Sequence, residues 1–129
     1  MNRKTCSTLL GAGSIFAALG VALGAFGAHG LKNTITPELI GTFETGVRYE
    51  MYHSFGLIVA GLLCRTSPED HAPTFRIAGW FFGLGIVLFS GSLYFLVLFD
   101  LPWLRAITPL GGLAFIAGWI SLGYAALRK

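Results

Sequence analysis

The stretch Thr5–Ala28, TCSTLLGAGSIFAALGVALGAFGA, contains 24 residues without a charged side chain and decides the fold class. A helix needs about 20 consecutive, mostly apolar residues to cross the hydrocarbon core of a bilayer. Two further charge-free stretches meet this length, Ile77–Phe99 with 23 residues and Ala106–Leu127 with 22. Backbone polar groups find no partners in lipid, and these runs lack the alternation of a membrane barrel, so each is predicted to be helical.

The composition of the 129-residue chain also indicates a lipid solvent. Hydrophobic residues make up 54% of the chain and charged residues only 12%, and 18 residues are glycine. Soluble domains carry roughly a quarter charged residues. Six acidic and nine basic side chains are therefore too few for the surface of a small soluble domain. A disordered chain is excluded, an ordinary soluble domain is disfavoured, and the chain is predicted to be an all-α integral membrane protein.

A shorter apolar run, Met51–Cys64, is ambiguous. Its 14 residues would form about 21 Å of helix, less than the roughly 30 Å of the hydrocarbon core. A helix start is indicated further upstream, where Thr36 is a suitable N-cap residue and is followed by Pro37 and an acidic residue in the first turn. We therefore predict an amphipathic helical segment over residues 37–48 that leads into a span over residues 45–64.

Lysine and arginine residues concentrate in the cytoplasmic segments of membrane proteins and so predict the orientation of the helices. Four spans, at residues 5–28, 45–64, 77–99 and 107–127, place six basic residues on the side of both termini and three on the other side. Three spans with an external N-terminus give the same count, but the Met-Asn-Arg-Lys start is typical of a cytoplasmic N-terminus. The prediction is one transmembrane domain over residues 1–129. It is a four-helix bundle in the plasma (bacterial inner) membrane, with the N- and C-termini on the cytoplasmic side.

Two further expectations concern the first stretch. A cleavable signal peptide has an apolar region of roughly 7 to 15 residues, so the longer run at Thr5–Ala28 favours a retained membrane anchor. Cys6 precedes this run and is not placed like a lipoprotein cysteine. In the four-span arrangement Cys6 and Cys64 both lie near the cytoplasmic face, a reducing compartment, so two free thiols are expected.

Small residues recur at helical spacing in the long apolar stretches. In lipid, such stripes let helix backbones approach each other closely. Their expected role is to pack helices within the chain or across the interface of a homo-oligomer. The glycines concerned are Gly13, Gly20, Gly24, Gly79, Gly83, Gly111 and Gly118.

The most informative polar residues lie around the start of the second span. Glu50 and His53 are one helical turn apart, roughly 8 to 12 Å inside the hydrocarbon boundary if the span begins near residue 45. In a functional interpretation they exchange a proton or bind a ligand, because ionisable groups at this depth usually face protein or water and histidine titrates near physiological pH. In a structural interpretation Arg48 and Glu50 reach the interface, the tyrosines join an aromatic belt and His53 hydrogen-bonds a neighbouring helix. The candidate polar site comprises His29, Arg48, Tyr49, Glu50, Tyr52 and His53.

Four segments, taken in order, resemble a known family. They read GAFGAHGLK at residues 24–32, TGVRYEMYH at 45–53, FSGSLY at 89–94 and ITPLGG at 107–112. With these motifs the chain resembles, over nearly its whole length, the YgdD/YwdK-like small membrane proteins, also called domain of unknown function 423 or uncharacterised protein family 0382. The resemblance implies a four-helix protein of the inner or plasma membrane and brings no established activity, cofactor or catalytic residue. It also implies Gln at position 50 in many relatives, which shifts weight from Glu50 to the other five polar residues.

Two classes of function follow from the sequence. The preferred one is a structural or accessory membrane protein that binds lipid or a partner through glycine-rich helix faces, because it needs no unusual chemistry. The alternative is a small permease or ligand-binding membrane protein whose site lies where His29 meets the start of the second span. The sequence shows neither a nucleophile and base at motif spacing nor a metal-ligand cluster, so it does not indicate an enzyme. Its basic residues form no patch for nucleic acid. The predictions are therefore no catalytic site, no metal, no cofactor and no nucleic acid, with membrane lipid, a second copy or a partner membrane protein as binding partner.

Overall fold

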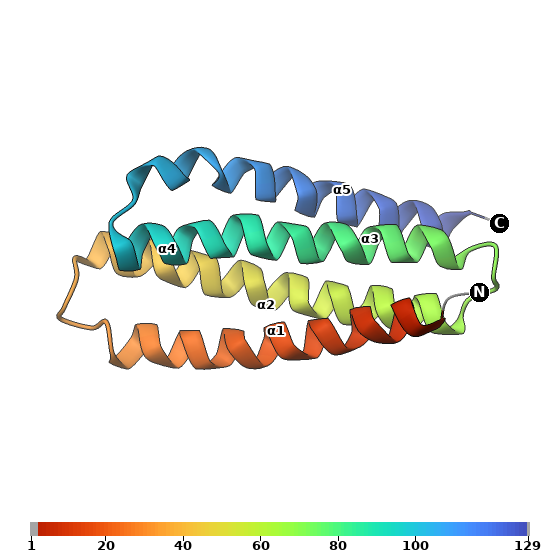
Figure 1. Ribbon diagram of the computed structural model, residues 1–129, viewed down its shortest axis with the longest axis horizontal. Coiled ribbons are helices and arrows are strands. Elements are labelled where there is room, and N and C mark those ends of the chain that lie inside the picture. The colour runs from red at the N-terminus through yellow and green to blue at the C-terminus, as the bar shows by residue number, and fades with distance from the viewer. Residues whose placement is uncertain (1–2, 129) are drawn as a thin grey trace.

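The computed structural model of the chain describes residues 3–128, and all regular secondary structure in them is helical. Four rods lie side by side in alternating directions, and the third and fourth rods each combine more than one element (Figure 1). The predicted all-α four-helix bundle is confirmed. In chain order the elements are α1 (Arg3–His29), α2 (Pro37–Thr66), α3 (Ala72–Gly85), the π-helix η1 (Ile86–Ser90), α4 (Gly91–Phe99), the 3-10 helix η2 (Pro102–Ala106) and α5 (Thr108–Leu127).

Both ends of the described chain lie at one end of the bundle, together with the α2–α3 loop (Figure 1). The α1–α2 and α4–α5 connections lie at the opposite end. Three segments are long and apolar enough to cross a membrane by length and composition, Arg3–His29, Ala72–Phe99 and Pro102–Leu127. Helix α2 is too polar to meet this test within the described chain, although its 30 residues make it as long as the others.

The predicted start of α2 is observed. The side chain of Thr36 accepts a hydrogen bond from the backbone N–H of Leu39 at 3.3 Å, Pro37 occupies the first turn and Glu38 is the acidic residue there. The helix then continues without a break to Thr66, where the N–H of Ser67 bonds the carbonyl of Leu63. The polar segment and the apolar run of this region therefore form a single helix.

The third rod differs from the prediction in two respects. It begins at Ala72, five residues before the predicted start at residue 77, because Pro73 is accommodated in the first turn. It also contains the π-helical segment Ile86–Ser90, which the apolar pattern does not reveal. At its other end Asp100 adopts a left-handed conformation, with φ 51°, and terminates α4.

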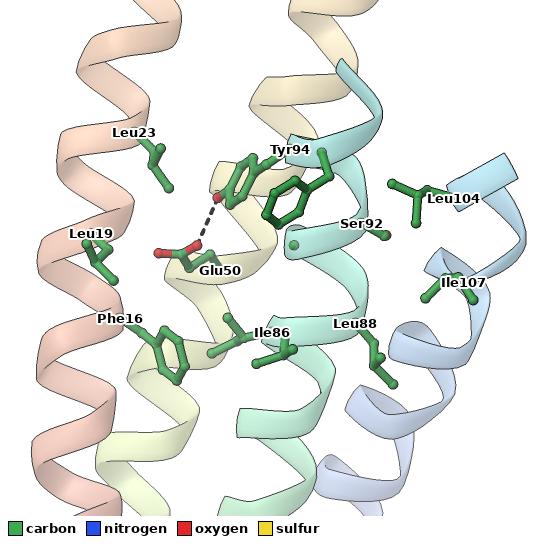
Figure 2. Close-up of a pocket in the computed structure, with 13 residues that line it drawn as sticks. Phe16, Leu19, Leu23, Glu50, Ile86, Leu88, Ser92, Tyr94, Leu104 and Ile107 are labelled. Atoms are coloured by element: carbon green, nitrogen blue, oxygen red, sulfur yellow. Dashed lines mark hydrogen bonds between the residues drawn. The ribbon is translucent and has the colours of Figure 1, made fainter. Parts of the chain in front are cut away.

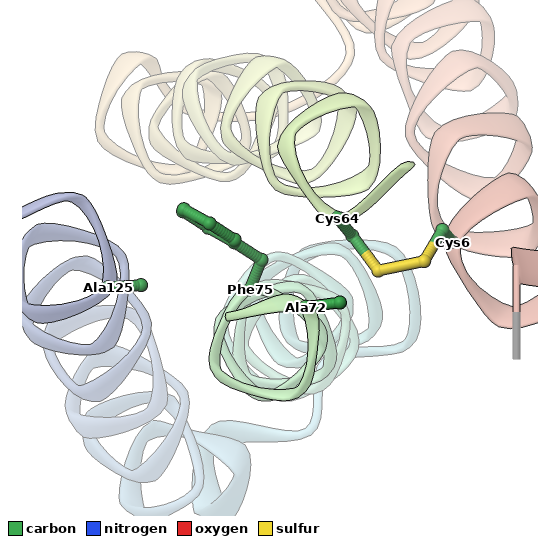
Figure 3. Packing of buried hydrophobic residues seen from close by; sticks show 5 residues of the cluster. All are labelled: Cys6, Cys64, Ala72, Phe75 and Ala125. Carbon is green, nitrogen blue, oxygen red and sulfur yellow. A yellow bond between two sulfur atoms is a disulfide. The ribbon is translucent and has the colours of Figure 1, made fainter. Parts of the chain in front are cut away.

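The two cysteines are not free, and the expectation of two thiols is wrong in this structure. Cys6 of α1 and Cys64 of α2 form a disulfide, with their Cα atoms 5.5 Å apart (Figure 3). The antiparallel packing of α1 on α2 brings them level with each other. Close approach is possible because Gly61 has no side chain: a Cβ atom there would lie 2.7 Å from the backbone nitrogen of Leu10. The prediction relied on the redox state of a compartment and did not include this register.

The bundle is packed tightly inside and is apolar outside. Phe43 and Phe82 have no exposed surface. Large apolar side chains also cover the outer faces, and Ile15 of α1 and Ile120 of α5 are 64% and 67% exposed. Apolar exposure over the whole outside is a liability in water but matches a lipid environment.

Candidate functional site

The candidate polar site predicted from the sequence separates into two groups in the structure. Glu50 and His53 are turned into the bundle and are only 3% and 5% exposed. The other four residues of the set are exposed: His29, Arg48, Tyr49 and Tyr52.

Glu50 pairs with a tyrosine of the third rod. The hydroxyl of Tyr94, on α4, donates a hydrogen bond to Oε1 of Glu50 at 2.9 Å (Figure 2). The ring of Tyr94 can approach α2 because Gly46 presents no side chain; a Cβ atom there would lie 2.9 Å from the ring. The second carboxyl oxygen of Glu50, Oε2, is buried and has no hydrogen-bond partner.

His53 is held by its own chain at both ring nitrogens. Trp119 of α5 approaches Nε2 with its indole Nε1 at 3.0 Å, and Nδ1 lies 2.7 Å from the carbonyl oxygen of Tyr49. Indole nitrogen only donates and a carbonyl only accepts, so Nε2 is the acceptor and Nδ1 carries the proton. The imidazole is neutral in this arrangement. Its ring also stacks on Phe115, with centroids 3.4 Å apart and planes 8° from parallel.

Glu50 and His53 therefore have different partners. Glu50 bonds the third rod and His53 bonds α5, and no hydrogen bond or ion pair joins the two within residues 3–128. The geometry does not support direct proton exchange between them.

His29 and Arg48 of the predicted set lie outside the bundle core. His29 is the last residue of α1, and its exposed side chain has no hydrogen-bond partner in the described part of the chain. Arg48 is exposed and donates to the hydroxyl of Thr45 at 3.3 Å. Neither contributes to the surroundings of Glu50 or His53, so the predicted convergence of His29 on the start of the second span is not observed.

Several residues that complete these polar contacts were not part of the predicted site. Tyr94 belongs to the FSGSLY segment, and only its position near two serines indicated a polar contact there. Trp119 lies in a long apolar run, and nothing in the sequence around it indicated a polar role. Ser90 donates to the carbonyl of Gly46 at 2.7 Å. The hydroxyls of Ser92 and Thr108 are 2.6 Å apart and connect α4 to α5.

Most glycines of the predicted stripes lie at close contacts between helices. A Cβ atom at Gly13 would meet Ile58 at 2.7 Å, at Gly20 it would meet Met51 at 2.5 Å, and at Gly111 it would meet the backbone nitrogen of Phe89 at 2.4 Å. Gly83 is an exception: nothing lies within 4 Å of its Cβ position, so it packs against no other helix of the chain, and a role at an interface between copies stays a prediction. The other three stripe glycines are also at close contacts: a Cβ atom at Gly24 would meet Val47, one at Gly79 would meet Leu9 and one at Gly118 would meet Phe82.

The residues offer no cluster for a metal ion. Within residues 3–128 no three His, Cys, Asp or Glu side chains come together in a metal-binding arrangement. What the site can do chemically is limited to one neutral, fully bonded imidazole and one carboxyl group with a single unpaired oxygen.

Comparison with known proteins identifies the family. The sequence profile described as "Protein of unknown function (DUF423)" matches residues 23–112. The UPF0382 membrane protein YwdK of Bacillus subtilis is 48% identical over 90% of this chain and 93% of its own length. UPF0382 membrane proteins of Staphylococcus haemolyticus and Staphylococcus epidermidis are each 44% identical, over 85% and 90% of this chain and 87% and 92% of their own lengths. No solved structure matches the chain. With this similarity over most of its length and its bundle of apolar helices, the chain belongs to the DUF423 (UPF0382) family of small membrane proteins.

Proposed function

We propose that this protein is a non-catalytic accessory protein of the plasma membrane, which acts by binding a partner membrane protein along its apolar outer surface. The observation that carries this proposal is the bonding of His53. Both of its ring nitrogens are occupied within the chain, by Tyr49 and Trp119. A histidine that moves protons or binds a ligand needs a nitrogen that faces the other reactant, and the indole N–H and the backbone carbonyl that face His53 do not exchange protons with it. His53 instead links α2 to α5.

The buried hydroxyls support the same proposal. Ser54 and Ser90 donate to backbone carbonyls at 2.6 Å and 2.7 Å, and Ser92 donates to the carbonyl of Phe89 at 2.8 Å. These bonds satisfy each group locally and do not form a continuous polar route along the bundle. A permease needs such a route, and the exposed positions of His29 and Arg48 do not extend one.

The distribution of charge supports a cytoplasmic position for both termini. Among the described residues, the end of the bundle with the termini carries five basic side chains, Arg3, Lys4, Arg65, Arg76 and Arg128. The other half of the bundle carries Lys32, Arg48 and Arg105. The positive-inside rule then favours the first end as cytoplasmic, as in a protein of the plasma membrane. The Cys6–Cys64 disulfide lies at this same end, so a cytoplasmic location predicts that the two thiols are kept reduced in the cell and that the bond forms on oxidation.

The outer face of α5 is the surface that best fits a partner. Most of the predicted glycine stripes are used for contacts inside the chain, so they do not supply an outer binding face. On α5, Leu113, Ile120 and Tyr124 are each more than half exposed. Gly123 lies beside them with nothing within 4 Å of its Cβ position, which leaves room for the backbone of another helix.

Photo-crosslinking in native membranes tests the proposal. A photoreactive amino acid at Ile120 should yield one discrete product with another membrane protein. The same probe at Ile15, on the outer face of α1, is the matched control and should yield only lipid adducts. Lipid adducts alone from both positions would overturn the accessory role. A product between two differently tagged copies of this chain would replace the partner protein with a homo-oligomer.

A further inference from the structure

A cavity of about 420 Å³ lies beside the Glu50–Tyr94 pair, between α1 and the third rod (Figure 2). Its walls are formed mainly by apolar side chains, such as Phe16 and Leu19 of α1 and Ile86 of η1. Pockets for small molecules have volumes of roughly 300 to 1,000 Å³ and combine an apolar lining with a few polar groups. The size and lining of this cavity fit that description.

Glu50 lines the cavity and carries a polar atom that the chain itself does not satisfy. Oε1 is bonded by Tyr94, but Oε2 is the one buried side-chain nitrogen or oxygen atom within residues 3–128 that has no partner. Only 3% of the surface of Glu50 is exposed. An unpaired polar atom in a protein interior costs free energy, and an ionisable residue among membrane helices usually serves a function. The unpaired oxygen therefore points to a ligand.

The cavity is reached from the side of the bundle that faces lipid. Leu19, Val87 and Phe95 line it and are each at least half exposed on the outer surface. Among the lining side chains, no group of polar residues marks an opening toward water. A ligand that dissolves in the hydrocarbon region can thus enter between α1 and α4.

We propose that this cavity binds a lipid-soluble amine, whose nitrogen pairs with Oε2 of Glu50 and whose apolar body contacts the walls. An amine satisfies the oxygen in either state of the pair: a protonated carboxyl donates to the nitrogen, and a carboxylate accepts from the ammonium. The single proton stays between the same two atoms, so the complex has no net charge. An alcohol of the same length could form a hydrogen bond but not a charge-assisted one, which is roughly twice as strong.

This site goes beyond the accessory role, and either can exist without the other. The ligand contacts Glu50 inside the bundle, whereas the proposed partner contacts the outer face of α5. Loss of amine binding therefore leaves the crosslinking result at Ile120 unchanged. Failure of the crosslinking experiment likewise does not affect the amine-binding measurement.

Decylamine and decanol are matched probes for the test, with the full chain reconstituted in phosphatidylcholine nanodiscs. Dicyclohexylcarbodiimide, a lipid-soluble reagent for carboxyl groups, should label Glu50, as located by mass spectrometry. Decylamine should slow this labelling about tenfold or more, and decanol at equal concentration should have little effect. Glu50→Gln keeps an oxygen that can accept from Tyr94 and should weaken decylamine binding roughly tenfold or more, measured as the saturable uptake of radiolabelled decylamine above that of empty nanodiscs. Glu44→Gln, at an exposed position on the same helix, should not.

Three results would overturn the site. They are failure of the carbodiimide to label Glu50, equal protection by decylamine and decanol, and equal decylamine binding by the wild type and Glu50→Gln. A second variant, Leu19→Trp, retains Glu50 but fills the cavity, and it should lose protection by decylamine. If Glu50→Gln does not fold, the comparison of the two probes on the wild-type chain decides the question alone.

Discussion

Ser90 donates its hydroxyl to the backbone carbonyl of Gly46 at 2.7 Å, and this bond joins the π-helical segment to α2 at a point where Ser90 has no exposed surface. π-helical turns are rare and occur frequently at functional sites. Here the turn lies next to Tyr94, whose ring rests against the same Gly46 and whose hydroxyl bonds Glu50. The contact between α2 and the third rod is thus fixed by a hydrogen bond and a close ring contact.

Replacing Ser90 with alanine should lower the free energy of unfolding by about 0.5 to 1.5 kcal/mol, because the carbonyl of Gly46 loses its partner from the other helix. Reversible unfolding in mixed detergent micelles measures the change. Ser14→Ala is the control, since Ser14 is exposed and bonds only the carbonyl of Leu10 in its own helix. An equal loss in both variants would contradict the structural role assigned to Ser90.

Gly111→Ala should destabilise the bundle by about 1 to 3 kcal/mol. The added methyl group would lie 2.4 Å from the backbone nitrogen of Phe89, and a backbone atom cannot move aside as a side chain can. Gly123→Ala on the same helix is the matched control, because its Cβ position is open. That variant should unfold no more easily than the wild type and gain up to about 1 kcal/mol of helix propensity. Thermal unfolding of the two purified variants tests the pair; a stable Gly111→Ala would disprove the close contact.

The disulfide between Cys6 and Cys64 should stabilise the oxidised protein by about 2 to 4 kcal/mol, because it closes a loop between residues 58 apart in the sequence. Unfolding with and without reductant measures this difference. The Cys6→Ser/Cys64→Ser double variant should be insensitive to reductant. Maleimide labelling of both thiols in the folded, non-reduced protein would contradict the disulfide.

The position of α2 can be tested by the accessibility of the loops at its two ends. In the Cys6→Ser/Cys64→Ser background, Lys32→Cys and Glu69→Cys each place one thiol at an exposed site. If α2 crosses the membrane, a membrane-impermeant maleimide added to intact cells should label position 32 and leave position 69 unlabelled until the cells are opened. Identical labelling of the two sites would instead support three spans with α2 on one side.

The sequence predicts the rods well because lipid imposes a simple rule. Long runs without charge must be helical, so α1, the third rod and α5 could be located from residue type alone. Local rules are less certain. Ile-Thr-Pro occurs at residues 35–37 and again at 107–109. Only the first threonine caps its helix; the hydroxyl of Thr108 instead contacts Ser92 in the neighbouring rod.

The candidate site was predicted only in part, because side-chain direction depends on neighbouring helices. Helical spacing identifies Glu50 and His53 as deep polar residues, and both are buried. Spacing along one helix does not show which rod each side chain meets. The separation of the two residues toward Tyr94 and Trp119, and the register that joins Cys6 to Cys64, arise from tertiary packing.

A double-mutant cycle on His53 and Trp119 tests most directly the claim that the polar residues of α2 hold the bundle together. Trp119→Phe removes the indole N–H and keeps a ring, while His53→Phe removes the acceptor and keeps an aromatic side chain against Phe115. Unfolding of the two single variants and the double variant in mixed micelles gives the coupling free energy between the two positions. This coupling should be about 0.6 kcal/mol and at most about 1.7 kcal/mol. Strictly additive losses, with no coupling between the two positions, would contradict the account.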